Sequence, residues 1–265
     1  MKRNPVKEKL KSGQLTLGGW ITIPHPAVAE VMALTGLEFL VIDTEHGAIN
    51  IESVQMLIQA MAGTEVVPIV RVAAGQRAFM NKILDTGPGG VIVPMVNSRQ
   101  EAEEAVRSAL YPPQGVRGIG LGRAQGYDDA RRSEYLKVAN DLILVMVQVE
   151  HVEAVKHIEE IVTTPGLDAV FVGPADLSGS MGLTGQADHP EVQKAIEKVV
   201  EAAARVHLPL GIPVGGPDNV AHRVRQGFQL LHVAVDSMCL GQACAHNLRS
   251  ARVAAAQALS AVPRL

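Results

Sequence analysis

The chain has 265 residues, of which 47% are hydrophobic and 3% aromatic, and its 24 basic and 27 acidic residues give a formal net charge of −3. This length suits one large α/β domain with an aliphatic core. The charge shows no basic excess for nucleic-acid binding, and no apolar run reaches the roughly 18 residues that a membrane span needs.

Apolar runs of strand length alternate along the chain with segments of helical periodicity. Amphipathic segments such as 51–63, 98–110 and 190–206 are predicted as helices. Eight runs are predicted as strands: 15–23, 38–43, 66–72, 90–96, 142–150, 168–173, 208–214 and 230–236. Alternation of this kind implies parallel strands with crossover helices, and near-continuous apolar strands fit a sheet covered on both faces. We therefore expect residues 1–265 to form a single (β/α)8 TIM barrel, with a doubly wound open sheet as the alternative.

Two segments depart from the regular alternation. Residues 111–128, YPPQGVRGIGLGRAQGYD, form an extra loop after the fourth strand, and loops of this length are usually functional or mobile. Residues 244–261 are Ala-rich and are predicted as a C-terminal helix that packs on its own barrel or on a neighbour. The basic start of the chain lacks the apolar segment of a secretion signal, and Cys239 and Cys244 lack CxxC spacing. A cytoplasmic protein with reduced thiols is therefore expected.

Polar residues recur where the predicted strands end, which is the end of a barrel that carries catalytic groups. A single polar residue at such a position can simply cap the next helix. Several that converge on one rim are harder to explain as caps. They are Asp43, Thr44, Glu45 and His46 after the second strand, Arg71 in the third, Gln148, Glu150 and His151 in or after the fifth, Asp176 after the sixth and Asp236 at the end of the eighth.

Glu150 and Asp176 follow consecutive strands, so their carboxylates should meet at one mouth of the barrel. Two such carboxylates repel each other unless a proton or a cation lies between them. Oxygen ligands without cysteine suit a hard divalent ion such as Mg²⁺ or Mn²⁺. The alternative is that the two carboxylates act in general acid/base catalysis without a metal. His151, next to Glu150, is expected to turn toward the following helix.

Arg71 lies in the apolar segment PIVRVA and needs an anionic partner there. It either forms a structural ion pair with Asp43 or Glu45, or stabilises an anion that forms during a reaction. His46 is the best candidate for a general base, because imidazole titrates near neutral pH, and Asp85 could orient its ring. The alternative for His46 is a loop histidine with satisfied contacts.

The segments FLVIDTEHG, IVRV, KILDTGPGGVIVPMVNSRQEAEEAVRSALYPPQGVRG, VQVE and VFVGPADLSGSMG together resemble the 4-hydroxy-2-oxoheptanedioate aldolase family. These are class II pyruvate aldolases, with 2-keto-3-deoxy-L-rhamnonate and 2-dehydro-3-deoxyglucarate aldolases as relatives. The resemblance covers roughly residues 15–240. It implies a (β/α)8 barrel that uses Mg²⁺, Mn²⁺ or Co²⁺ to cleave 4-hydroxy-2-oxo acids reversibly, through a metal-bound enolate, to pyruvate or a close 2-oxo acid and an aldehyde.

The resemblance also implies roles for individual residues. Glu150 and Asp176 would bind the metal, His46 with Asp85 would be the base, and Arg71 would stabilise the enolate. Gln148 and the turn of Gly173, Pro174 and Ala175, together with Asp176, would hold the 2-oxo acid. Arg123 matches a loop arginine that contacts the acceptor in some relatives, although GLGRAQGYDD departs from their pattern here. No Schiff-base lysine is needed if a metal polarises the substrate, and Lys82, the nearest candidate, is expected to face solvent.

The resemblance further implies a homohexamer in which residues 244–261 pack on a neighbouring subunit. It does not identify the aldehyde. Two other functions remain open from the sequence. One is a lyase or hydrolase acting on acyl-CoA esters on the same scaffold, for which no basic cluster stands out. The other is a catalytically silent barrel that serves in binding or assembly.

Overall fold

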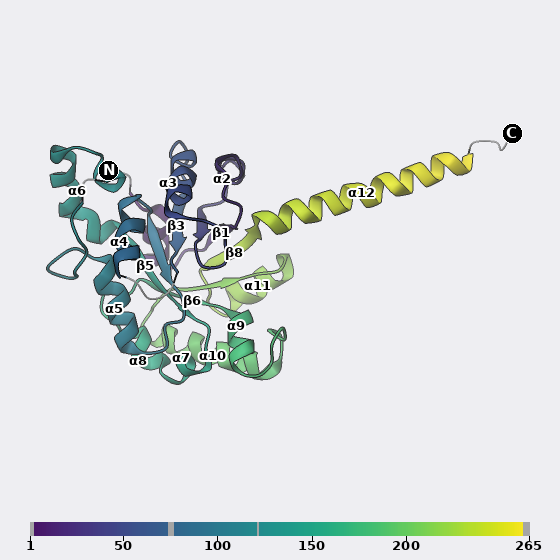
Figure 1. Cartoon of the computed structure of the whole chain (residues 1–265). Helices are drawn as coiled ribbons and strands as arrows, with labels where there is room; N and C mark the ends of the chain where they lie inside the picture. Colours follow the sequence, from purple (N-terminus) through teal and green to yellow (C-terminus); the bar gives the residue numbers. More distant parts are fainter. Residues whose placement is uncertain (1–2, 74–76, 121, 262–265) are drawn as a thin grey trace.

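The computed structural model describes residues 3–73, 77–120 and 122–261, which form a closed barrel of eight parallel strands in the order β1 to β8 (Figure 1). The strands are β1 (Thr16–Ile21), β2 (Phe39–Asp43), β3 (Val67–Arg71), β4 (Gly90–Val93), β5 (Leu144–Val149), β6 (Ala169–Val172), β7 (Leu210–Pro213) and β8 (Leu230–Val235). All eight predicted strands are present, each slightly shorter than predicted. The barrel is closed because β1 pairs with both β2 and β8, which excludes the open sheet.

Successive strand residues point alternately into and out of the barrel. In β2, Phe39 and Val41 belong to the cluster that fills the barrel, whereas Leu40 and Ile42 belong to the layer between sheet and helices. Both layers are mostly aliphatic. Two-sided burial therefore explains the near-continuous apolar strands.

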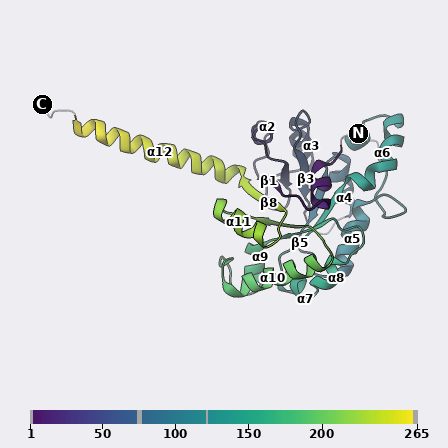
Figure 2. The ribbon, with the colours of Figure 1, turned by 180° about the vertical axis from the view of Figure 1, so that it is seen from behind.

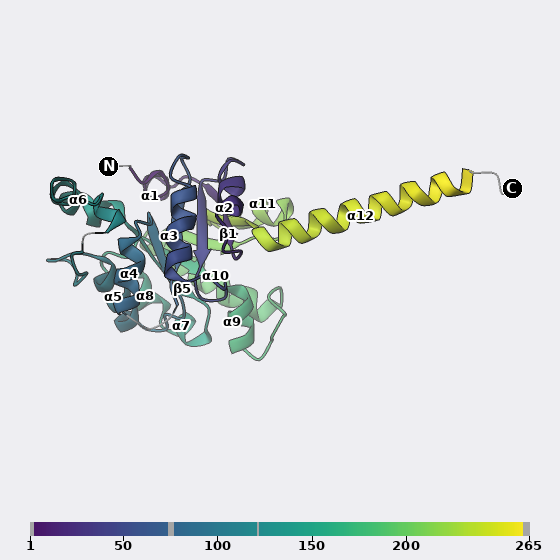
Figure 3. The same cartoon turned by 45° about the horizontal axis from the view of Figure 1, so that its top comes forward.

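The outer layer consists of helices that connect the strands (Figures 1 and 3). They are α2 (Pro26–Ala33), α3 (Ile51–Ala60), α4 (Arg77–Asp85), α5 (Arg99–Ala109), α6 (Asp129–Leu142), α7 (Val152–Lys156), α8 (Ile158–Val162), α9 (Pro174–Ser180), α10 (Pro190–Arg205) and α11 (Pro217–Arg225). The predicted helices at 51–63, 98–110 and 190–206 correspond to α3, α5 and α10. The long segment after β4 contains two elements that were not predicted, the 3-10 turn η1 (Arg123–Gln125) and α6.

The N-terminal helix α1 (Pro5–Lys11) packs at the end of the barrel where the strands begin. Its residues Val6 and Leu10 join the cluster inside the barrel. The buried Lys7 ammonium lies 2.9 Å from an oxygen of Asp168. A cavity of about 310 Å³ lies beside this helix, between α10 and the start of β7, at the opposite end from the predicted site.

The C-terminal helix α12 (Asp236–Ala261) is longer than predicted and projects away from the barrel (Figures 1 and 2). Residues 237–260 are all exposed, and they include Met238, Leu240, Leu248, Val253 and Leu259. Its first residue, Asp236, accepts hydrogen bonds from the backbone of Thr22 and Ile23, at 2.8–3.0 Å. Asp236 therefore anchors the helix to the end of β1. Within the described ranges, no helix is long and apolar enough to cross a membrane.

Candidate active site

The barrel interior carries polar side chains at the end where the strands finish. Val41 and Ile69 point inward from β2 and β3, so Asp43 and Arg71, two positions later on each strand, point inward as well. By the same alternation, β5 directs Gln148 and Glu150 inward. We call Asp43, Glu45, Arg71, Gln148 and Glu150 the rim cluster. All but Glu45 are buried, and Glu45 is partly buried.

The rim cluster rests on Trp20 of β1, the only tryptophan of the chain. The Arg71 guanidinium lies 5.0 Å from the centre of the indole. The rings of Phe171 and His232 lie 5.6 Å and 5.0 Å from it. Burial lowers the pKa of His232 to about 4, and the nearby Arg71 charge acts in the same direction. The floor of the site is therefore aromatic and uncharged near neutral pH.

Arg71 forms a bidentate ion pair with Asp43. Its Nε lies 3.0 Å from Oδ1 and its Nη2 lies 2.7 Å from Oδ2. Burial would raise the pKa of Asp43, but the hydrogen bonds and the charge of Arg71 outweigh it and hold that pKa below its usual value. The structural ion pair considered for Arg71 is thus present. Its Nη1 faces Glu45 Oε2 at 3.2 Å.

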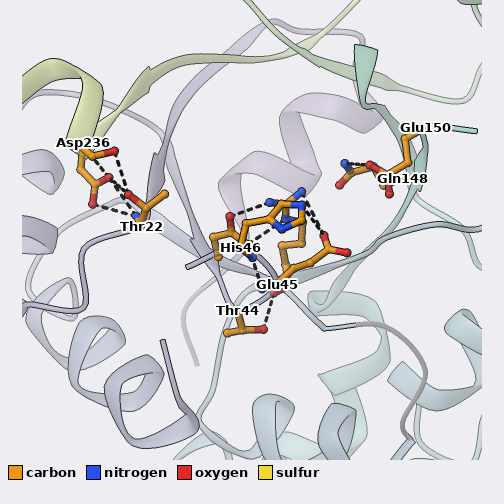
Figure 4. Close-up of polar contacts among 10 residues, drawn as sticks. Thr22, Thr44, Glu45, His46, Gln148, Glu150 and Asp236 are labelled. Atoms are coloured by element: carbon orange, nitrogen blue, oxygen red, sulfur yellow. Dashed lines mark hydrogen bonds and ion pairs between the residues drawn. The ribbon is translucent and has the colours of Figure 1, made fainter. Parts of the chain in front are cut away.

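The turn after β2 is fixed by Asp43, whose Oδ1 accepts hydrogen bonds from the N–H groups of Glu45 and His46 at 3.1 and 3.2 Å. Gly47 is required here, because a Cβ at this position would lie 2.3 Å from the carbonyl oxygen of Asp43. The His46 side chain is 65% exposed, and its Nε2 lies 4.0 Å from Glu45 Oε2 (Figure 4). The predicted base therefore lies at the rim, open to a substrate.

Glu150 is held from two sides, and Figure 4 shows its contact with Gln148. Its Oε1 accepts a 2.7 Å hydrogen bond from the Met95 N–H, and its Oε2 accepts one from Gln148 Nε2. Met95 has a left-handed backbone, with φ of 55°. Gly173 leaves room for both side chains, since a Cβ there would lie 2.8 Å from Glu150 Oε2.

Burial raises the pKa of Glu150 to about 7, and the negative charges of Glu45 and Asp176 add to the shift. The Met95 hydrogen bond and the Arg71 charge oppose it. Asp176 is exposed at the start of α9 and is close enough to act on Glu150 electrostatically. This part of the site therefore favours an added proton or cation.

The donor set fits a hard divalent ion. Glu150 and Asp176 supply carboxylate oxygens, and Gln148 Oε1 is a buried carbonyl oxygen without a hydrogen-bond partner among the described residues. Within that part of the chain, no group of three or more His, Cys, Asp or Glu side chains is arranged to hold a metal. A cation held here would therefore keep several positions for water or substrate oxygens, as Mg²⁺ commonly does.

Asp85 and Arg123, both predicted for the site, lie elsewhere in this chain. Since α4 returns from the rim toward the start of β4, its last residue, Asp85, is far from His46. Asp85 Oδ1 lies 3.2 Å from Gln125 Nε2 and 3.6 Å from Arg117 Nη2. Arg123 donates to the carbonyl oxygen of Thr86 at 3.0 Å. Within one chain, Asp85 therefore does not orient the His46 imidazole, because the direction of α4 separates the two residues.

We call the group around Asp85 the α4 cluster: Asp85, Tyr111, Arg117 and Gln125. Gln125 Nε2 also donates to the Tyr111 hydroxyl at 2.9 Å. The guanidinium of Arg117 is 4.3 Å from the centre of the Tyr111 ring. The cluster fastens the loop of residues 111–128 to the end of α4.

Other polar residues at strand ends have structural roles. The Nδ1 atoms of His25 and His151 accept hydrogen bonds from backbone N–H groups at the starts of α2 and α7. His151 thus turns toward its helix, as expected. Asp236 lies apart from the rim cluster, bound to Thr22 (Figure 4). Lys82 is exposed, also as expected.

Three features of the site were not identified from the sequence. Trp20 forms the floor, the Met95 N–H holds Glu150, and Glu45 lies beside His46 as well as Arg71. Because residues two positions apart on a strand point to the same side, an inward-pointing Gly18 would have predicted that Trp20 points into the barrel as well. No sequence signal identifies the left-handed backbone at Met95.

A family model described as HpcH/HpaI aldolase/citrate lyase matches residues 16–243. A hydroxypyruvate/pyruvate aldolase of Cupriavidus necator is 36% identical over 240 residues, which cover 91% of this chain and 89% of the relative. A 4-hydroxy-2-oxo-heptane-1,7-dioate aldolase of Escherichia coli is 37% identical, covering 91% and 92%. A crystal structure of a family protein from Burkholderia cenocepacia superposes with a TM-score of 0.90 at 32% identity, covering 94% and 99%.

Proposed function

The chain belongs to the HpcH/HpaI aldolase/citrate lyase family, and we propose that it cleaves 4-hydroxy-2-oxo acids reversibly to pyruvate, or a close 2-oxo acid, and an aldehyde with the help of a divalent metal. Its relatives are carbon–carbon lyases. The observation that carries the proposal is the buried Glu150 carboxylate, whose pKa is raised to about 7 beside Asp176 and Glu45. A cation at this point would relieve the repulsion.

Glu150 and Asp176 would hold the metal, with Mg²⁺, Mn²⁺ or Co²⁺ as candidates. When bound, such an ion acts as a Lewis acid that polarises the carbonyl group of a 2-oxo acid. Glu150 is already oriented for this task by the Met95 N–H and by Gln148. Because its neighbours fix the side chain, little reorganisation is needed on binding.

The 2-oxo acid would lie between Gln148 and the turn of Gly173, Pro174 and Ala175. The first N–H groups of a helix lack intrahelical acceptors, so those at the start of α9 are free to bind substrate oxygens. Pro174 occupies the first position of α9, where its missing N–H costs nothing. Arg71, held rigid by Asp43 and Trp20, supplies positive charge where the enolate forms.

His46 is the proposed base, acting directly or through one water molecule. In the cleavage direction His46 removes the proton of the C4 hydroxyl group, and the C3–C4 bond breaks. The electron pair of that bond forms the enolate of pyruvate. The imidazolium then returns the proton to C3. Neutral imidazole is thereby regenerated, so the proton balance is closed.

Asp85 and Arg123 require a second copy of the chain if they contribute to this site, because they lie at the far end of α4. The exposed helix α12, about 39 Å long at 1.5 Å per residue, supports such an assembly. Because most helical stability in proteins comes from the packing of an apolar face, the exposed apolar side chains of α12 favour a surface for it to cover. We therefore propose that α12 packs on a neighbouring subunit, and the family resemblance leads us to propose that the assembly is a homohexamer. Cys239 and Cys244 would be reduced in the cytoplasm.

Complementation tests this sharing of sites. His46→Gln and Asp85→Asn chains should each be inactive alone. If two copies share a site, hetero-oligomers formed by unfolding and refolding the two variants together should regain part of the activity. No recovery in oligomers shown to be mixed would place Asp85 outside the catalytic machinery.

The proposed reaction is tested by pyruvate release from a 4-hydroxy-2-oxo acid. Release should stop after treatment with EDTA and return with Mg²⁺, Mn²⁺ or Co²⁺. A panel of aldehydes with pyruvate as donor would then identify the acceptor. An unchanged rate after complete metal removal would contradict the metal requirement.

A further inference from the structure

We infer that Asn97 and Glu101 are positioning residues for Glu150. They hold the turn between β4 and α5 in the conformation that directs the Met95 N–H to the Glu150 carboxylate. The inference rests on the proposed function in that Glu150 is taken as a metal ligand. It assigns a role in the site to two residues that otherwise belong to the start of a helix.

The turn has an unusual backbone at the residue that contacts Glu150. Met95 has φ of 55°, in the left-handed region that a residue with a side chain rarely adopts. In this conformation its N–H donates to Glu150 Oε1 at 2.7 Å. The Met95 side chain is 41% exposed, so the packing of that side chain does not hold the backbone there. Such a conformation persists where its surroundings fix it, so other contacts of the turn supply the restraint.

Asn97 closes the turn through its side chain. Its Nδ2 donates to the carbonyl oxygen of Met95 at 3.0 Å. Its Oδ1 is shielded from solvent and has no hydrogen-bond partner within the described residues. An unpaired acceptor opposes stability, so the contribution of the Asn97 amide lies in its bond to Met95.

Glu101 restrains the same turn from the first turn of α5. Its Oε2 accepts the N–H groups of Asn97 at 2.6 Å and of Ser98 at 3.1 Å. The bond to Ser98 forms a capping box with the Ser98 hydroxyl, which accepts from the Glu101 N–H at 3.2 Å. The bond to Asn97 lies outside that motif. It extends the cap of α5 into the turn and fixes the backbone two residues after Met95.

The restrained turn is joined to β5 at two adjacent positions. The Met95 N–H reaches the Glu150 side chain, and the Val96 N–H donates to the carbonyl oxygen of Gln148 at 3.3 Å. Partners of this kind orient a metal ligand, and their loss commonly weakens metal binding by about 10–100-fold. A loosened turn would therefore release one side of Glu150.

Hydrogen exchange in the metal-free full chain tests the inference without any measurement of activity. Asn97→Ala should speed exchange of the Met95 amide by about fivefold, the factor that one ordinary hydrogen bond contributes. Gln100→Ala, which removes an exposed amide from the first turn of α5, is the matched control and should leave that rate unchanged. An unchanged exchange rate of the Met95 amide in Asn97→Ala overturns the inference.

Titration with Mn²⁺ measures the consequence for the site. Asn97→Ala and Glu101→Ala should each weaken binding by about tenfold, because both residues act on Glu150 through Met95. Glu101→Gln should keep most of the affinity, since its amide oxygen can accept from the same two N–H groups. Met95→Gly adopts the left-handed conformation without strain, so Asn97→Ala should have a smaller effect in that background.

The outcomes separate the inference from the proposed function. If the wild type binds Mn²⁺ and Asn97→Ala binds it equally well, the inference is overturned. Normal binding by a Glu101→Ala chain that unfolds more easily would show that Glu101 only caps α5. Failure of the wild type to bind Mn²⁺ would instead contradict the proposed metal role, and exchange of the Met95 amide would still decide whether Asn97 holds the turn.

Discussion

The rim cluster and the α4 cluster both combine arginine and carboxylate groups, but they differ in what is in surplus. The rim cluster has more carboxylates than cations, whereas the α4 cluster has more hydrogen-bond donors than acceptors. In the rim cluster, Asp43, Glu45 and Glu150 surround the single cation Arg71, and the pKa of Glu150 rises to about 7. In the α4 cluster, Arg117 is buried beside Asp85 alone, and its Nε and Nη2 lack hydrogen-bond partners within the described residues.

This difference indicates what each cluster can do. Excess carboxylate at an open rim favours binding a cation or moving a proton. Surplus N–H groups, such as those of Arg117 beneath the loop, can hold the chain by hydrogen bonds but do not bind a metal cation. We therefore expect substitutions in the rim cluster to change chemistry. In the α4 cluster, we expect substitutions of Tyr111, Arg117 and Gln125 to change stability, whereas Asp85 is proposed to act in the site of a second copy.

Glu150→Gln should have the largest effect on activity. The amide keeps the shape of the side chain but removes the charge, so pyruvate release should fall by roughly 1,000-fold and Mn²⁺ binding should be lost. Calorimetric titration with Mn²⁺ measures the second effect. Glu153→Gln, at a surface ion pair with Lys156, is the control and should titrate normally. Normal Mn²⁺ binding by Glu150→Gln would remove Glu150 from the ligand set.

Arg71→Lys should come next. Lysine keeps the charge but cannot form the bidentate contact with Asp43, so exchange of pyruvate protons should slow by about 100-fold. Arg71→Ala would also leave Asp43 as a buried unpaired charge and cost about 3–5 kcal/mol of unfolding free energy. Arg99→Lys, at an exposed pair with Glu103, should leave both unchanged. Full exchange in Arg71→Lys would exclude a role for the guanidinium geometry.

Gln125→Leu tests the α4 cluster. The substitution removes the hydrogen-bond partner of the Gly122 N–H and of the Tyr111 hydroxyl and leaves Asp85 with Arg117 alone, which should cost about 2 kcal/mol of unfolding free energy. Proteolysis within 111–128 should become faster, whereas Mn²⁺ affinity should stay the same. A loss of Mn²⁺ affinity would show that the two clusters are coupled.

His232 should give a smaller effect, visible as a dependence of stability on pH. Its pKa is lowered to about 4 in the folded chain, so below its unfolded pKa of 6.5 only the unfolded state binds the proton. Unfolding free energy should therefore fall by about 2 kcal/mol between pH 7 and pH 5 through this residue. Urea unfolding at both pH values checks this, since His232→Phe should lack that part of the loss. An equal loss in the variant would place its origin elsewhere.

The fold could be predicted because each strand is buried on both faces and therefore reads as an apolar run. The strand ends were placed within a few residues. Helix α6 was missed because only Ala139 of its residues is buried, so it has little apolar pattern. The start of α12 was missed because Asp236 was assigned to the preceding strand.

The site was predictable to the extent that it depends on alternation along single strands. Alternation brings Arg71, Gln148 and Glu150 to one rim. The sequence could not show which carboxylate lies near His46. The answer depends on the direction of α4, which carries Asp85 away, and on the side-chain geometry of the turn at 43–46. Glu45 lies next to His46 in sequence, yet adjacent residues often point apart, so spacing alone gave no reason to pair them.

The most direct measurement of the central claim is anomalous diffraction from a crystal grown with Mn²⁺ and oxalate. We predict a manganese peak within about 2.3 Å of carboxylate oxygens of both Glu150 and Asp176, with oxalate completing the coordination. A fully ordered rim with no peak, or a peak that neither residue contacts, would contradict the account.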